Sequence, residues 1–145
     1  MNSARYPFVT VGEQHMYMFY SDGPMGTIRK AVLYERIGKN LFNLGFGDWN
    51  GELNQINDFG RSNNGDRDKV LATVAFTALD FTDQFPDAHI LFEGTTLART
   101  RLYQMSIAYN LLEISTYFQI QGLKSESWEP FRLGRNYKAF LVRRI

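Results

Sequence analysis

The chain has 145 residues, a formal net charge of +1, 44% hydrophobic and 15% aromatic residues, and no cysteine. These values are typical of a folded globular chain and argue against disorder, so we expect residues 1–145 to form a single domain. The lack of cysteine excludes disulfides, thiol nucleophiles and thiolate metal sites. The N-terminus lacks the apolar segment of a secretory signal, and no apolar run reaches the roughly 20 residues of a membrane helix. We therefore expect a soluble cytoplasmic protein with no membrane partner.

The charges are distributed unevenly along the chain. Residues 1–47 carry five basic and three acidic side chains, residues 48–95 carry three and nine, and residues 96–145 carry eight and three. Either a polarised surface or two patches that neutralise each other would produce this pattern. We favour the second interpretation.

The first part of the chain has the alternating apolar and β-branched pattern of strands. Turn-forming residues at Ser21–Gly26 separate two of these segments. The predicted strands are Tyr6–Val11, Met16–Tyr20, Ile28–Ile37, Asn40–Trp49 and, more weakly, Leu53–Phe59.

A helix is predicted over residues 67–85. Its apolar residues recur at helical spacing, Asp66 precedes it as the N-cap, and Pro86 ends it. The apolar stripe consists of Leu71, Val74, Ala78, Phe81 and Phe85.

The rest of the chain is predicted to contain one more strand, one more long helix and two final strands. Ala88–Phe92 is apolar on both faces, as in a buried strand. A helix over residues 97–117 would then place Leu102, Met105, Tyr109 and Leu112 on one stripe. Phe118–Leu123 and Tyr137–Arg143 are predicted as strands joined by a polar loop.

This order predicts an α+β fold, in which two long helices pack on a mainly antiparallel sheet. A β-α-β unit, which would pair two strands in parallel, occurs at most once. We expect one core that contains Phe81, Ile90, Phe92, Leu102, Met105 and Leu141.

The segment Gly94–Tyr103 is the strongest candidate for a binding site. A glycine turn leads into a helix that Thr95 or Thr96 would cap, and Arg99 and Arg101 lie in its first turns. Basic side chains there oppose the helix dipole unless an anion is near. Open N–H groups, hydroxyls and guanidinium groups together could hold a phosphate or carboxylate. The structural alternative, which is favoured, is an ordinary cap whose arginines pair with acids such as Glu93 or Asp87.

A second helix start offers Asn63 and Asn64 as anion contacts, in the loop Ser62–Asp66. The simpler explanation is that Asn-Gly forms a turn and Asp66 caps the helix. If both helix N-termini converged in space, they would form a two-sided cleft.

The sequence contains no recognisable catalytic or metal-binding pattern. His15 and His89 are far apart, no G-x-S-x-G sequence occurs, and the acids Asp48, Glu52 and Asp58 are loosely spaced. We therefore expect no metal and no cofactor, and whether the chain is an enzyme stays open.

Several strings resemble a family of short bacterial proteins classified only as a domain of unknown function. They are Arg5-Tyr6-Pro7, Gly23-Pro24-x-Gly26, Asn43-Leu44-x-Phe46-Gly47-Asp48, Ser62–Asp66 with Lys69–Val74, Gly94–Tyr103 and Tyr137-x-Ala139-Phe140-Leu141-Val142. The resemblance spans nearly the whole chain. It implies a self-contained, single-domain cytoplasmic protein and carries over no activity.

Our functional hypothesis is a non-enzymatic binding module with an anion or phosphate site at a helix N-terminus. The candidate contacts are Thr95, Thr96, Arg99 and Arg101, with Asn63 and Asn64, and the partner would be a phosphate-bearing ligand or nucleic acid. One alternative is an enzyme acting on a phosphorylated small molecule or nucleic-acid end, with Asp66 or Glu93 as general base. Another is an interaction protein without a ligand, such as a homodimer.

Overall fold

The computed structural model describes residues 4–12, 15–57 and 64–145, which form three helices and nine strands. The helices are α1 (Arg67–Gln84), α2 (Leu97–Tyr109) and α3 (Leu111–Tyr117). The strands are β1 (Phe8–Val11), β2 (Met16–Gly23), β3 (Gly26–Gly38), β4 (Leu41–Asn50), β5 (Gln55–Asn57), β6 (His89–Phe92), β7 (Phe118–Lys124), β8 (Ser127–Pro130) and β9 (Phe140–Arg144). Among these residues, no helix is both long and apolar enough to cross a membrane.

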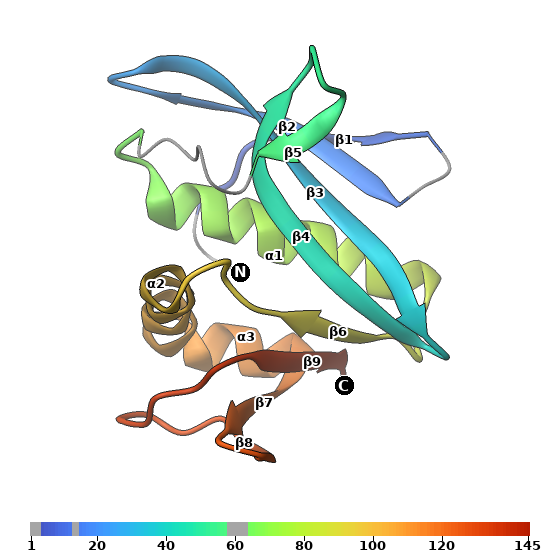
Figure 1. Ribbon diagram of the computed structural model, residues 1–145, viewed down its shortest axis with the longest axis vertical. Coiled ribbons are helices and arrows are strands. Elements are labelled where there is room, and N and C mark those ends of the chain that lie inside the picture. The colour runs from blue at the N-terminus through green and yellow to red at the C-terminus, as the bar shows by residue number, and fades with distance from the viewer. Residues whose placement is uncertain (1–3, 13–14, 58–63) are drawn as a thin grey trace.

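All nine strands belong to one sheet, in the order β1-β2-β3-β4-β6-β9-β7-β8, with β5 paired to the far end of β4 (Figure 1). Strands β1 to β4 form a meander of antiparallel hairpins. The β2–β3 hairpin turns tightly at Pro24 and Met25, and Gly26 has a φ of +92°, which glycine adopts without strain.

The sheet is mixed, and the prediction of a mainly antiparallel sheet is therefore wrong. β4 and β6 pair in parallel, with Phe42 opposite Ile90. The chain leaves β4, passes through β5 and α1, and returns to pair with β4 in the same direction, as in a β-α-β crossover. A strand of four residues such as β6 carries too little pattern to reveal its direction from sequence.

The prediction of two long helices is also wrong, because the predicted helix over residues 97–117 is broken at Asn110. This residue ends α2 and begins α3, with φ −105° and ψ 18°. Its side-chain amide donates to the carbonyl oxygen of Ser106 at 2.9 Å. Asparagine competes in this way with the helix backbone, which explains both its low helix propensity and the break.

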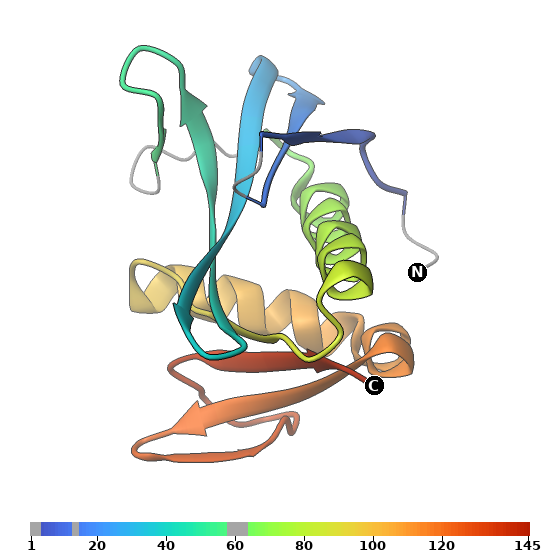
Figure 2. The ribbon, with the colours of Figure 1, turned by 90° about the vertical axis from the view of Figure 1, so that its right-hand side faces the viewer.

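The sheet bends so that β2–β4 and β6–β9–β7 run in clearly different directions, and the three helices lie on its concave side (Figure 2). The main core fills the space between the sheet and the helices. Its centre is Phe81 of α1, whose ring stacks on Tyr34 at 4.3 Å and meets Phe42 edge-on at 4.9 Å. In the stripe predicted for this helix, Val74, Ala78 and Phe81 are buried, and Leu71 and Phe85 are half-buried.

The predicted face of the second helix is wrong. Met105 is 59% exposed and Leu112 is 90% exposed, whereas the buried residues of α2 are Thr100, Tyr103 and Ser106. Of the six predicted core residues, Phe81 and Ile90 are buried, Phe92, Leu102 and Leu141 are half-buried, and Met105 faces outward.

The C-terminal part contains one strand that the sequence did not predict. β8 pairs with β7 around a turn at Ser125, within the segment expected to be a polar loop. The last strand begins at Phe140 rather than Tyr137, because Tyr137 instead packs its ring against Gly122.

Candidate functional site

The N-terminus of α2 has the cap that the sequence predicts. The hydroxyl oxygen of Thr96 accepts from the backbone N–H of Arg99 at 3.2 Å. The preceding loop approaches the helix so closely that a Cβ at Gly94 would lie 2.6 Å from the backbone nitrogen of Thr100. The N–H of Gly94 donates to the Thr100 hydroxyl at 3.0 Å. Only glycine fits there, so the loop and the first turn of α2 form one tightly joined unit.

The two predicted arginines diverge. Arg99 donates to the hydroxyl of Thr95 at 2.9 Å and lines a pocket, whereas Arg101 reaches the side-chain oxygen of Asn136 at 3.4 Å. Residues two apart on a helix point about 200° apart, which explains the divergence. Thr95 and Arg99 are thus brought together, and Arg101 lies outside their pocket.

The second predicted site is engaged in holding the fold. Asn64 is buried; its side-chain oxygen accepts from Met25 N–H at 2.7 Å, and its amide group donates to Gly26 and Ser21. Asn63 lies outside the described residues. Asp66 occupies the N-cap position, but it makes no capping bond with its side chain.

The carboxylate of Asp66 is instead bound to two hydroxyl groups. It accepts from Tyr6 at 2.6 Å and from Ser21 at 2.5 Å. Burial, followed by the bond to Asp66, raises the pKa of the Tyr6 phenol. Asp66, one of the two acids considered as a general base, therefore joins the N-terminal segment to β2 and α1. The other, Glu93, is exposed at the rim of the Arg99 pocket.

The two helix N-termini open onto adjoining pockets. One, of about 410 Å³, contains Thr95 and Arg99, and the other, of about 500 Å³, contains Arg67 and Lys69 from the start of α1. Both pockets share Tyr103 of α2 and Phe46 of β4. We call these two pockets together the anion groove, after the ligand that the sequence led us to expect there.

A buried ion pair lies beside this groove. Lys30 of β3 is 4% exposed and forms a salt bridge with Asp48 of β4, and Lys30 also lines the pocket of α1. Burying a lysine is costly unless the charge is paired, and Asp48 supplies the pairing. Four basic side chains, Lys30, Arg67, Lys69 and Arg99, line the groove together with the acidic residues Asp66, Asp68 and Glu93. The charge of Lys30 is already paired with Asp48, and the ammonium of Lys69 lies 4.2 Å from the centre of the Tyr6 ring.

The acidic and histidine side chains considered as metal ligands do not come together. Among residues 4–12, 15–57 and 64–145, no three acidic or histidine side chains gather in a way that could hold a metal ion. Asp48 is engaged by Lys30, and Asp58 lies outside the described residues. His15 packs edge-on against Phe81 and Phe85.

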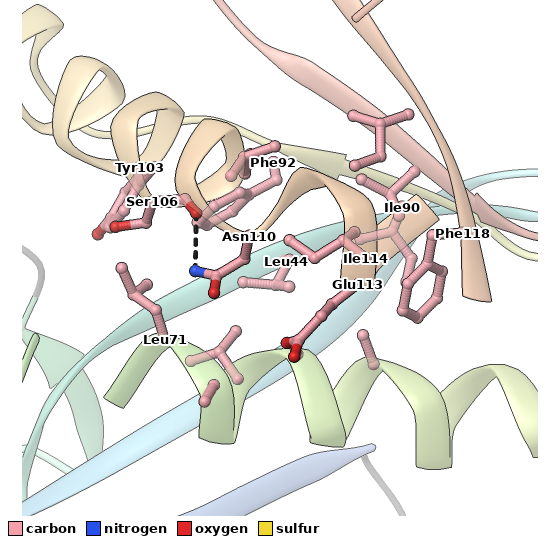
Figure 3. Close-up of a pocket in the computed structure, with 17 residues that line it drawn as sticks. Leu44, Leu71, Ile90, Phe92, Tyr103, Ser106, Asn110, Glu113, Ile114 and Phe118 are labelled. Carbon is pink, nitrogen blue, oxygen red and sulfur yellow. Dashed lines mark hydrogen bonds between the residues drawn. The ribbon is translucent and has the colours of Figure 1, made fainter. Parts of the chain in front are cut away.

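A third pocket lies between α1 and the α2–α3 pair, and sequence reasoning missed it (Figure 3). It has a volume of about 110 Å³ and mainly apolar walls, with Ser106, Asn110 and Glu113 as polar residues beside Tyr103. We call it the interhelical pocket. The only hint in the sequence is the helical spacing of three polar residues, Ser106, Asn110 and Glu113, which places them on one helix face. Because apolar residues occupy the opposite face, this polar face is expected to be exposed to solvent and not to line a pocket.

The comparisons with known proteins identify a family and no relative of known activity. No curated protein and no solved structure matches the chain. The model of a family of unknown function, DUF6934, matches residues 2–145. The match covers nearly the whole chain, which confirms the resemblance to a family without assigned function. The chain therefore belongs to the DUF6934 family, a family of unknown function.

Proposed function

We propose that the protein is a cytoplasmic, non-enzymatic binding module that holds a phosphate or similar anionic group in the anion groove. Thr95 and Arg99 contact the anion from α2, and Arg67 and Lys69 approach it from α1. A helix N-terminus attracts anions through its unpaired N–H groups and its dipole, and guanidinium groups add charge-assisted hydrogen bonds.

One observation carries the proposal: the starts of α1 and α2 open onto adjoining pockets that share Phe46 and Tyr103. Each helix start lines one of the two pockets, so basic side chains of α1 and of α2 border neighbouring parts of one groove. Arg101, which the sequence also suggested, is turned away toward Asn136. Asn64 supports the groove by holding the β2–β3 hairpin.

Thermal unfolding at low salt tests this proposal. Inorganic phosphate at ten times its dissociation constant should stabilise the fold by about 1.4 kcal/mol and raise Tm by roughly 5 °C. Sodium chloride at equal ionic strength should not, and added salt should weaken the phosphate effect. A short single-stranded oligonucleotide tests whether the phosphate of a nucleic acid is preferred over the free ion.

Arg101→Ala is the matched control for Arg99→Ala, because the two arginines lie two residues apart on α2 but face different surroundings. Arg99→Ala should abolish the phosphate-dependent rise in Tm, and Arg101→Ala should retain it. The proposal fails if neither phosphate nor the oligonucleotide shifts the wild-type Tm, or if both variants respond alike.

The exposed side of α2 and α3 favours a second candidate, an interaction with another copy of the chain. Leu97, Met105, Tyr109 and Leu112 are all exposed there at helical spacing. Grouped apolar side chains on a surface are typical of interfaces. Light scattering across a range of concentrations should then show a dimer that Tyr109→Asp dissociates; a monomer at all concentrations removes this candidate.

A further inference from the structure

The interhelical pocket has apolar walls from all three layers around it. Leu71 and Val74 come from α1, Ile90 from the sheet, and Ile107 and Ile114 from α2 and α3. Its volume of about 110 Å³ approaches that of an apolar cavity of about 150 Å³ that holds a benzene molecule. The space therefore suits a single ring or a short hydrocarbon chain.

Two polar atoms interrupt this apolar lining. Ser106 is only 8% exposed, and its hydroxyl has no hydrogen-bond partner within the part of the protein that the structure describes. The side-chain oxygen of Asn110 likewise has none among those residues, because the amide nitrogen makes the bond to the Ser106 carbonyl. Buried polar groups are nearly always paired, so a buried hydroxyl left without a protein partner calls for a ligand or an equivalent partner.

The break between α2 and α3 directs these atoms into the pocket. Because the nitrogen of Asn110 is held at the Ser106 carbonyl, its oxygen points toward α1 (Figure 3). Ser106 and Asn110 are four residues apart, so their side chains lie on one wall, within reach of a single polar group. Glu113 extends toward α1 on the same side.

We propose that the interhelical pocket binds a compact apolar molecule that carries one uncharged hydroxyl group. The hydroxyl donates to the oxygen of Asn110 and accepts from the hydroxyl of Ser106, and the hydrocarbon part fills the apolar space. A carboxylate would lack the donor that Asn110 requires and would face the negative charge of Glu113. The ligand class is therefore a small alcohol and not a fatty or aromatic acid.

The polar residues of this pocket differ from those of the anion groove, although Tyr103 borders both sites. Ser106, Asn110 and Glu113 line the interhelical pocket, and Arg67, Lys69 and Arg99 do not. An uncharged alcohol gains nothing from the helix dipoles, so the two proposals stand or fall independently.

Titration of the full chain with benzyl alcohol, benzoate and toluene, followed by NMR chemical shifts, tests the proposal with ligands of nearly equal size. Benzyl alcohol should bind about tenfold more tightly than benzoate and about fivefold more tightly than toluene, which has the ring but no hydroxyl. The shifted resonances should belong to α1, α2 and α3 around the pocket. Benzoate binding as tightly as the alcohol, or no binding of the alcohol, would overturn the proposal.

Three variants locate the binding. Ser106→Ala should weaken benzyl alcohol binding about fivefold, leave toluene binding unchanged and leave Tm unchanged or higher, because it removes an unpaired buried hydroxyl. Ser115→Ala on the exposed side of α3 is the matched control and should bind as the wild type does. Ala75→Leu, which adds volume to the pocket wall on α1, should abolish binding of both ligands.

Unchanged alcohol binding in Ser106→Ala contradicts the proposed contacts, and unchanged binding in Ala75→Leu contradicts the location. If Ala75→Leu does not fold, the comparison of Ser106→Ala with Ser115→Ala still decides the proposal. A lower Tm with unchanged binding in Ser106→Ala would mean that the hydroxyl is purely structural, and would also overturn it.

Discussion

Helix α1 buries a larger and more apolar set of side chains than helix α2 does. α1 turns Val74, Ala78 and Phe81 of its predicted stripe into the core, and it also buries Val70 and three threonines. α2 buries Thr100, Tyr103 and Ser106 and leaves Met105 and Tyr109 exposed. Both helices lie on the concave side of the same sheet (Figure 2). The predicted apolar stripe therefore identifies the buried side of α1 but not the buried side of α2.

The two helices bury different side chains because they contact different parts of the fold. α1 packs against the aromatic side chains of β2, β3 and β4, and a tight hydrophobic centre results around Phe81. α2 is positioned by polar contacts, including those of Thr100 with Gly94 and of Gln104 with Tyr137. Close-packed burial is therefore concentrated around Phe81 of α1. Two of the pockets lie between α1 and the α2–α3 pair, and the third lies between β4 and the start of α2.

Phe81→Ala should have the largest effect, because the ring is fully buried at the centre of the α1 contact. We expect a loss of about 3–5 kcal/mol in the free energy of unfolding, measured by chemical denaturation. Phe92→Ala, which truncates a half-buried ring beside α2, should cost less. Equal costs for the two variants would show that the two regions are packed alike.

Alkaline pH should weaken the α1 side through its buried tyrosines. Burial raises the pKa of Tyr34, so the folded protein retains this proton after the unfolded chain has lost it near pH 10. Stability is then fully present below pH 10 and falls above it, by up to about 1.4 kcal/mol per pH unit for one such group. Chemical denaturation at pH 8 and pH 11 should show that the free energy of unfolding falls less in Tyr34→Phe than in the wild type. An equal fall in both proteins would contradict the role of this phenol.

Thr96→Ala should cost about 1 kcal/mol, because it removes the cap that starts α2. Thr95→Ala is the control, since Thr95 accepts from the Arg99 side chain and makes no capping bond. Thermal or chemical unfolding should rank Thr96→Ala below Thr95→Ala in stability. The reverse order would place the cap one residue earlier.

Met105→Ser should have the smallest effect, within about 0.5 kcal/mol, because the side chain is mostly exposed. The corresponding change on α1, Val74→Ser, places a hydroxyl in the core and should be far more costly. A loss above about 1 kcal/mol for Met105→Ser, measured at concentrations where the chain is monomeric, would mean that α2 is turned differently.

Local patterns predicted the parts of the fold that depend on neighbours in sequence. The β2 and β3 strands, the stripe of α1 and the Thr96 cap follow from alternation, helical spacing and hydroxyl chemistry, and the structure contains them. The break at Asn110 could have been suspected, because asparagine disfavours a helix interior. The sequence could not predict whether the N-termini of α1 and α2 lie near each other, because their distance depends on the path of the chain between them.

The sequence by itself determined that the chain has strands and helices, where most of them lie, and that α2 starts with a capped, arginine-bearing turn. The tertiary structure decided that β4 and β6 run in parallel, that Thr100, Tyr103 and Ser106 face inward, and that Arg99 and Arg101 separate. The physical reason is the distance along the chain over which each kind of interaction acts. Caps and periodicity act over one or two helical turns, whereas strand direction, buried faces and pockets depend on residues brought together from distant parts of the chain.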